Sequence, residues 1–194
     1  MLKKRNNQAR SFEEDEAYLV REAQKGNSQA FGLLYERYAD RIYRYMCLRL
    51  GDPVEAEDLT AEVFLRALES LGSFRWRGAP FGAWLFRLAH NIAVDYWRKS
   101  RRQFPLPSEV SHAVPNRNGD VEKVLERKML LREIQEAMKY LTPLQQQVIT
   151  LRFAAGLSIA ETAQVMGKKE GAVKNLQHKA LKALRKLLAK PTRA

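Results

Sequence analysis

The sequence predicts an all-α protein with two helical domains joined by a flexible linker. Apolar residues recur at helical spacing along most of the chain, and alternating strand-like patterns are almost absent. One stretch, 103–121, interrupts this pattern with three prolines. We therefore expect a loose tail over 1–12, a four-helix N-terminal domain over 13–102 and a C-terminal helix-turn-helix domain over 122–190.

Turn signals divide the N-terminal domain into four helices. Ser28 follows a glycine–asparagine pair and can cap the second helix. Pro53 disfavours helical backbone in the residue before it, and Pro80 is well placed as the first residue of the fourth helix. The expected helices cover about 13–25, 28–50, 54–71 and 80–101.

The C-terminal domain ends in a tight pair of helices, after helices expected at about 121–141 and 143–155. Ser158, followed three residues later by Glu161, forms a capping box, and Gly167 supplies a turn at little steric cost. A long helix of about 170–188 follows, so the pair has the parts of a helix-turn-helix. Its expected inner face carries Val173, Leu176, Ala180, Ala183 or Leu184, and Leu187.

The outer face of this long helix is basic and is predicted to bind duplex DNA. Such a helix can lie in the major groove, where its first turns meet base edges and its flanks meet phosphates. The alternative is a solvated helical hairpin whose lysines only face water. The coincidence of a capped helix, a glycine turn and a one-sided basic helix favours DNA. The candidate contacts are Lys169, Lys174, Asn175, His178, Lys179 and Lys182.

The third predicted helix is acidic along its first turns. Part of this charge is ordinary, because acids near a helix N-terminus complement the helix dipole. Its expected buried side is marked by Leu59, Val63, Phe64 and Leu68, which leaves an acidic and polar outer side. That side could meet a basic protein partner and is a poor surface for DNA.

The loop at 72–79 interleaves aromatic and cationic residues and is predicted to bind unpaired bases. Aromatic rings stack on bases with little sequence preference, while cations hold the phosphates. Polar residues recur at helical spacing on the fourth helix and extend this surface. The alternative places the tryptophans in the core, and we accept it for Trp84. The candidate contacts are Phe74, Arg75, Trp76, Arg77, Arg87, Asn91 and Arg98.

Charge and composition narrow the class of protein. The net charge is +12, with +6 over 75–102 and +9 over 122–194, which suggests two contacts on one long polyanion. Cys47 is the single cysteine, so no intrachain disulfide can form. No apolar run approaches the about 20 residues of a membrane span, so we expect a cytoplasmic protein without membrane insertion. We find no metal-ligand cluster, phosphate-cradling loop or nucleophile–base pair, and predict neither a cofactor nor an enzyme.

Four segments, in order and spacing, resemble the extracytoplasmic-function (ECF) sigma factors of the sigma-70 superfamily. They are AEDLTAEVFLRA at 56–67, FGAWLFRLAHNIAVDYWRK at 81–99, LTPLQQQVI at 141–149 and the helix-turn-helix through GAVK at 171–174. The resemblance implies that 74–98 opens and reads a −10-type element as single strand. It also implies that the C-terminal domain reads a −35-type element as duplex.

The same resemblance implies the partners. The acidic helix would dock on the clamp of the largest subunit of core RNA polymerase through Glu57, Asp58, Thr60, Glu62 and Arg66. Promoter DNA is the second partner, and an anti-sigma factor is a further candidate. A stand-alone helix-turn-helix transcriptional regulator is the alternative function. It would not explain the acidic helix or the aromatic loop.

Overall fold

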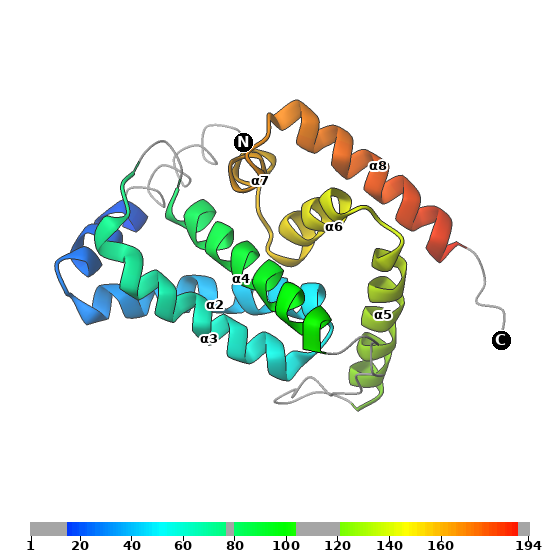
Figure 1. The fold of residues 1–194 in the computed structure, drawn as a ribbon, viewed down its shortest axis with the longest axis horizontal. Helices are drawn as coiled ribbons and strands as arrows, with labels where there is room; N and C mark the ends of the chain where they lie inside the picture. Colours follow the sequence, from blue (N-terminus) through cyan, green and yellow to red (C-terminus); the bar gives the residue numbers. More distant parts are fainter. Residues whose placement is uncertain (1–14, 77–79, 104–120, 190–194) are drawn as a thin grey trace.

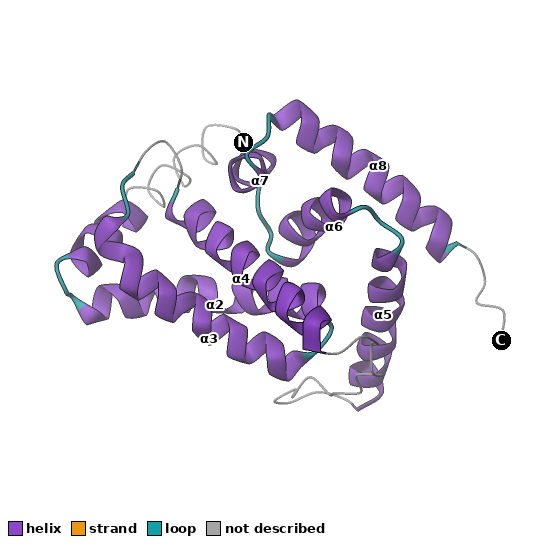
Figure 2. Ribbon diagram, in the orientation of Figure 1, coloured by secondary structure: helices purple, strands orange, loops and turns teal. Residues whose placement is uncertain are grey.

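The computed structural model describes residues 15–76, 80–103 and 121–189. Within these residues every regular element is a helix, and the connections between helices are short (Figures 1 and 2). The predicted all-α fold class is therefore confirmed. The predicted tail falls on residues outside the described part, as does most of the predicted linker.

Four long helices build the N-terminal half. The described part of the first helix covers residues 15–24. It is followed by α2 (Ser28–Leu50), α3 (Pro53–Ser70), the short 3₁₀ turn η1 (Leu71–Ser73) and α4 (Phe81–Gln103). The described ends of all four helices lie within about two residues of the predicted boundaries, because turn residues separate the helices.

The caps of α2 and α3 follow from residues at their ends. The cap of α2 is Asn27, whose side chain accepts from the backbone N–H groups of Gln29 and Ala30, so the prediction of Ser28 as cap is wrong. Asparagine caps as well as serine does, and here it stands one residue earlier. Gly51 ends α2 at φ 84°, a left-handed conformation that favours glycine. Asp52 then caps α3.

The buried side of α3 differs from the predicted one at one position. Leu59, Val63 and Phe64 are buried as expected, but Leu68 is 52% exposed. Ala67 is buried instead, because the buried stripe continues from Val63 by four residues rather than five.

The C-terminal half consists of α5 (Val121–Lys139), α6 (Pro143–Ile149), the π-helical turn η2 (Thr150–Ala154), α7 (Ile159–Met166) and α8 (Glu170–Leu188). The helix predicted at 143–155 is thus real but closes in a π turn. The Ser158–Glu161 capping box is confirmed: each residue's side chain accepts from the other's backbone N–H.

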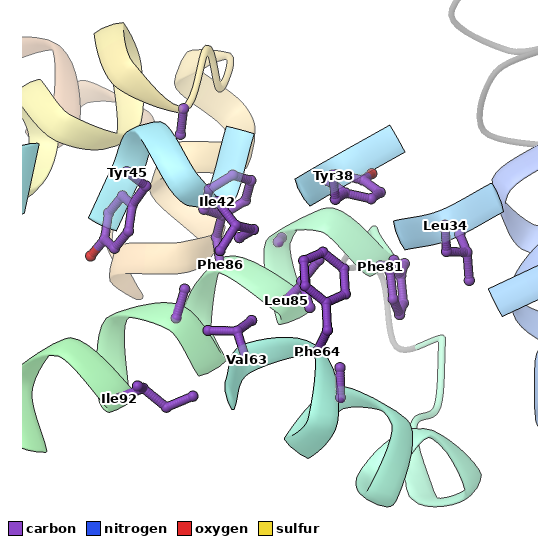
Figure 3. Packing of buried hydrophobic residues seen from close by; sticks show 14 of the residues in the cluster. Leu34, Tyr38, Ile42, Tyr45, Val63, Phe64, Phe81, Leu85, Phe86 and Ile92 are labelled. Carbon is purple, nitrogen blue, oxygen red and sulfur yellow. The ribbon is translucent and has the colours of Figure 1, made fainter. Parts of the chain in front are cut away.

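The main apolar core crosses from one half of the chain to the other. Figure 3 shows side chains of α2, α3 and α4 converging, among them Tyr45, Val63 and Phe86. Residues from the C-terminal half join the same cluster, namely Leu151, Ala155, Leu157 and Val165. A second, smaller cluster lies among α5, α6, α7 and α8. The two halves therefore pack against each other.

A buried carboxyl group ties the first helix to α2 and α4. Glu16 is 2% exposed, and its two oxygens accept from the Tyr38 hydroxyl at 2.7 Å and from the Gly82 N–H at 3.3 Å. Gly82 cannot carry a side chain here, because a Cβ would lie 2.7 Å from the Tyr38 oxygen. The carboxyl group thus supplies an acceptor to the first turn of α4, where backbone N–H groups lack helical partners.

We predict that Glu16→Ala lowers the free energy of unfolding by about 1–3 kcal/mol, because it leaves the Tyr38 hydroxyl and the Gly82 N–H without an acceptor. Glu16→Gln keeps an acceptor for Gly82 and a partner for Tyr38, and should cost less. Urea denaturation of both variants measures this. Arg21→Ala, at an exposed position of the same helix, is the control. Equal losses in the Ala and Gln variants would contradict the assignment.

Burial raises the pKa of Glu16 above its usual 4.5. A carboxyl group whose pKa is higher in the folded than in the unfolded chain binds its proton more tightly when folded. Ionising Glu16 should therefore weaken the fold as the pH rises through and above about 4.5. We expect the difference in unfolding free energy between wild type and Glu16→Gln to fall over this range. A difference independent of pH would show that the pKa is not raised.

Candidate nucleic-acid and protein-binding surfaces

Helix α8 presents one apolar face to the protein and one cationic face to solvent. Val173, Ala180 and Leu184 are buried, and Leu176, Ala183 and Leu187 pack against the same cluster, so the predicted inner face is confirmed. All six predicted contacts are exposed: Lys169, Lys174, Asn175, His178, Lys179 and Lys182. Apart from Lys169, which precedes the helix, they share the side opposite Val173 and Ala180. This cationic face can meet a polyanion along its length.

Hydrogen bonds join the segments around the turn between α7 and α8. Gly167 adopts φ 61°, and the N–H of Lys168 donates to the Ala163 carbonyl at 2.9 Å, which closes α7. Arg152 donates through Nε to Gln177 Oε1 at 2.9 Å and also donates to the Leu157 carbonyl. Arg152 thereby holds the start of α7 and the middle of α8 together. Sequence reasoning missed this role, because only the fold brings Arg152 to Gln177.

The aromatic loop is divided between the core and the surface. Phe74 is 7% exposed and packs against Trp84 and Phe81, with ring centroids 5.0 and 5.9 Å away. Aromatic neighbours cover the Phe74 ring in this structure, so its predicted stacking on bases has no exposed ring face here. Trp76 is 44% exposed and meets the Phe74 ring edge-on. Trp84 packs against the core, as expected.

Polar contacts hold the aromatic loop in place. Gln24 Nε2 donates to the carbonyls of Leu71 and Phe74, both at 2.9 Å. Arg75 is exposed but donates to the carbonyls of Gly72 and Phe74 within its own loop. Hydrogen bonds therefore hold the part of the loop that precedes the exposed Trp76. Arg77 lies outside the described residues.

The predicted stripe on α4 is present. Arg87, Asn91 and Arg98 are exposed at positions i, i+4 and i+11, which share one side of a helix. Arg98 also pairs with Asp95 at 3.1 Å. Val94, 42% exposed, extends this side, and Trp97, 39% exposed, borders it one turn further on. Sequence reasoning did not select them, although Val94 stands three residues from Asn91, a spacing that places both on one side of a helix. At the other end, Arg87 Nη2 donates to the Gln164 carbonyl of α7 at 2.6 Å.

The outer side of α3 combines acids with exposed leucines. Glu57 and Asp58 are exposed as predicted, and Glu62 pairs with Arg66 at 2.5 Å. Thr60, also predicted to contact the partner, is only 7% exposed in this structure, and its hydroxyl donates to the Ala56 carbonyl. The exposed Leu65 and Leu68 lie on the acidic side instead. This surface suits a protein partner that offers both cations and apolar groups.

The described residues contain no cluster of three or more His, Cys, Asp or Glu side chains placed to hold a metal ion. Among the same residues, no helix is long and apolar enough to cross a membrane.

Comparison with known families matches both halves of the chain. The models for Sigma-70 region 2 and Sigma-70, region 4 match residues 34–103 and 131–184. The ECF RNA polymerase sigma factor BldN of Streptomyces coelicolor is 44% identical over 171 residues, which cover 88% of this chain and 64% of BldN. The chain thus spans less than two thirds of BldN. SigX of Bacillus subtilis, another ECF RNA polymerase sigma factor, is 34% identical over 81% of this chain and 83% of SigX.

Solved structures of similar fold cover most of the chain. The structure of CnrH in complex with the cytosolic domain of CnrY matches with a TM-score of 0.69 and 25% identity, over 90% of this chain and 97% of that one. The sigma factor RpoE of Bartonella quintana, crystallised with the anti-sigma factor NepR, matches with a TM-score of 0.63 over 81% of this chain and 96% of that one. At 22% identity the second match shows the fold alone.

We predict that Phe74→Ala lowers the free energy of unfolding by about 3–5 kcal/mol, because it leaves a cavity among packed rings. Trp76→Ala, its matched control two residues away, should cost less than about 1 kcal/mol, since much of the ring already faces solvent. Thermal and urea denaturation measure both. If the two substitutions cost the same, the division of the loop into a buried and an exposed ring is wrong.

Proposed function

The chain belongs to the ECF RNA polymerase sigma factors of the sigma-70 family, and on that premise we propose that it binds core RNA polymerase and directs promoter-specific initiation through three surfaces. The observation that supports this most is the presence, on one chain, of an acidic helix, an exposed aromatic beside a polar stripe, and a cationic recognition helix. We propose that the protein acts in the cytoplasm, as an initiation factor rather than a catalyst.

The acidic side of α3 is the proposed docking surface for the polymerase clamp. Glu57 and Asp58 are exposed, and neither takes part in the ion pair that joins Glu62 to Arg66. Leu65 and Leu68 add exposed apolar area between the charges. Interfaces of this kind gain affinity from apolar contact, and gain specificity and association rate from charge complementarity.

Trp76 and the α4 stripe are the proposed surface for the −10-type element. Trp76 offers a ring with 44% exposure on an anchored loop, and Asn91 and Arg98 offer hydrogen-bond donors on the neighbouring helix. A stacking platform beside polar donors suits unpaired bases better than duplex DNA. The buried Phe74 is not part of this surface, but its ring packs against Trp76 and so helps to position it.

The cationic face of α8 is the proposed surface for the −35-type duplex. Lys174, Lys179 and Lys182 can neutralise phosphates, while Asn175, in the second turn of the helix, can meet a base edge. A stand-alone regulator could use this face too. It would leave the acidic side of α3 and the exposed Trp76 without a role, and we therefore favour the sigma factor.

Reversing the charges of Glu57 and Asp58 tests the docking surface. The double variant Glu57→Lys, Asp58→Lys should keep its fold, since both side chains are exposed, and should bind core polymerase at least about tenfold more weakly because like charges then face the clamp. Affinity is measured by competition against the wild-type chain. The control, Glu133→Lys with Glu136→Lys, reverses two exposed acids on α5. Unchanged affinity of the α3 variant would show that α3 does not dock.

Promoter opening tests the proposed −10-type surface. Trp76→Ala with Asn91→Ala should spare polymerase binding and −35-type duplex recognition but impair strand opening. Stacking stabilises each exposed base by about 1–3 kcal/mol, so opening should fall by up to about a hundredfold. Permanganate reactivity of unpaired thymines measures this, with Tyr140→Ala, an exposed aromatic of the C-terminal half, as control.

A template already mismatched across the −10-type element should restore part of the lost transcription, because it removes the cost of unpairing. Opening of intact duplex at the wild-type level by the double variant would rule out this surface. Trp76 would then be a packing residue of the loop.

A further inference from the structure

The first helix, over residues 15–24, holds the backbone of the aromatic loop just after the end of α3. Gln24 is half-buried, and its Nε2 donates to the carbonyls of Leu71 and Phe74, both at 2.9 Å. A side-chain amide nitrogen carries two hydrogens, so each carbonyl can receive one of them. Gln24 therefore spends its whole donor capacity on the backbone of a segment about 50 positions away in the chain.

The Phe74 carbonyl controls how the chain approaches Trp76. The Leu71 carbonyl also accepts from the Phe74 N–H at 3.0 Å, which closes the turn η1, and Phe74 then has extended backbone with φ −60° and ψ 131°. The carbonyl of Phe74 lies in the rigid peptide plane that it shares with Arg75. Holding its oxygen therefore orients the backbone that leads to Trp76. Arg75 Nη1 donates to the same oxygen at 3.0 Å and reinforces this orientation.

The same helix also holds the far end of the loop. Glu16 accepts from the Gly82 N–H at 3.3 Å, in the first turn of α4. Glu16 and Gln24 lie eight residues apart, which is about 12 Å along a helix axis. Three residues between them are buried in the main apolar cluster, namely Leu19, Val20 and Ala23. A helix packed into the core thus fixes the loop at both ends.

We propose that Gln24 is a positioning residue for promoter opening, which sets the loop backbone so that the Trp76 ring meets unpaired bases. Gln24 touches no DNA in this assignment and acts through Trp76. The role of Trp76 rests on the function proposed above, whereas the anchoring rests on the two hydrogen bonds of Gln24. If the ring is presented in only a fraction of molecules, its contribution to opening falls with that fraction.

Hydrogen exchange of the full chain tests the anchoring without DNA. Gln24→Glu keeps the size of the side chain but turns a carboxylate, which cannot donate, toward two carbonyls. Gln24→Ala removes the donor without adding charge. The matched controls are Gln29→Glu and Gln29→Ala, at an exposed position in the first turn of α2.

Both Gln24 variants should loosen the loop selectively. One net hydrogen bond corresponds to a factor of about five in a local opening equilibrium. Exchange of the backbone N–H groups over residues 71–76 should therefore be at least about fivefold faster than in the wild type. Exchange over residues 56–68 of α3, measured by mass spectrometry in the same samples, should stay unchanged. Both Gln29 controls should match the wild type in both segments.

Promoter opening by reconstituted holoenzyme tests the positioning. Gln24→Ala should lower the permanganate reactivity of unpaired thymines by about fivefold, while binding to core polymerase and to −35-type duplex stays at the wild-type level. The same substitution in a Trp76→Ala chain should add little further loss, because there is no ring left to position. A residue that only stabilises the fold would lower opening by the same factor in both chains.

Each outcome bears on the proposal. Unchanged exchange over 71–76, or equal acceleration over 56–68, overturns the anchoring. Faster exchange with opening at the wild-type level overturns the positioning, as does an equal loss with and without the Trp76 ring. Failure of the proposed function would appear differently: Trp76→Ala with Gln24 intact would open promoters as well as the wild type does, while the exchange rates would still decide whether Gln24 anchors the loop.

Discussion

Burial of apolar surface around α2 is the interaction on which the rest of the molecule depends. Leu34, Ile42, Tyr45 and Met46 have no exposed surface, and they belong to one cluster with residues of α3, α4 and the C-terminal half. Burying each such side chain is worth about 1.5–3 kcal/mol, more than a typical surface ion pair. Helix α7, with 8 residues, is too short to be stable alone and takes its stability from this packing.

Hydrogen bonds then decide where the helices begin, end and meet. Side-chain caps at Asn27, Asp52, Thr142 and Ser158 start four of the helices. Between helices, buried or half-buried polar groups satisfy backbone atoms that helical bonding leaves free. Glu16 accepts from the first turn of α4, and Arg41 donates to the carbonyl that follows the π turn. These contacts position the helices that apolar burial holds together.

The charged residues lie on the helix faces that remain exposed after the apolar faces are buried. The acids of α3, the stripe on α4 and the cations of α8 lie on different helices, so the proposed surfaces for a protein partner and for DNA are separate. The apolar residues between the charges on α3 and α4, Leu65, Leu68, Val94 and Trp97, add contact area where it can be used in recognition. One of these surfaces also touches the C-terminal half, where Arg87, although exposed, donates to the Gln164 carbonyl of α7.

Local chemistry let the sequence by itself determine the all-α class, most helix boundaries and the two faces of α8. A capping box, a glycine at φ 61° and a period of 3.6 residues act within one or two helical turns, so the residues concerned are neighbours in the chain. Tertiary structure alone decided that Phe74 and Thr60 are buried, that Leu68 is exposed, and that Arg152 meets Gln177. It also decided that Arg87 meets Gln164, a residue 77 positions away. Such contacts depend on how whole helices pack, and no local pattern in the sequence carries that information.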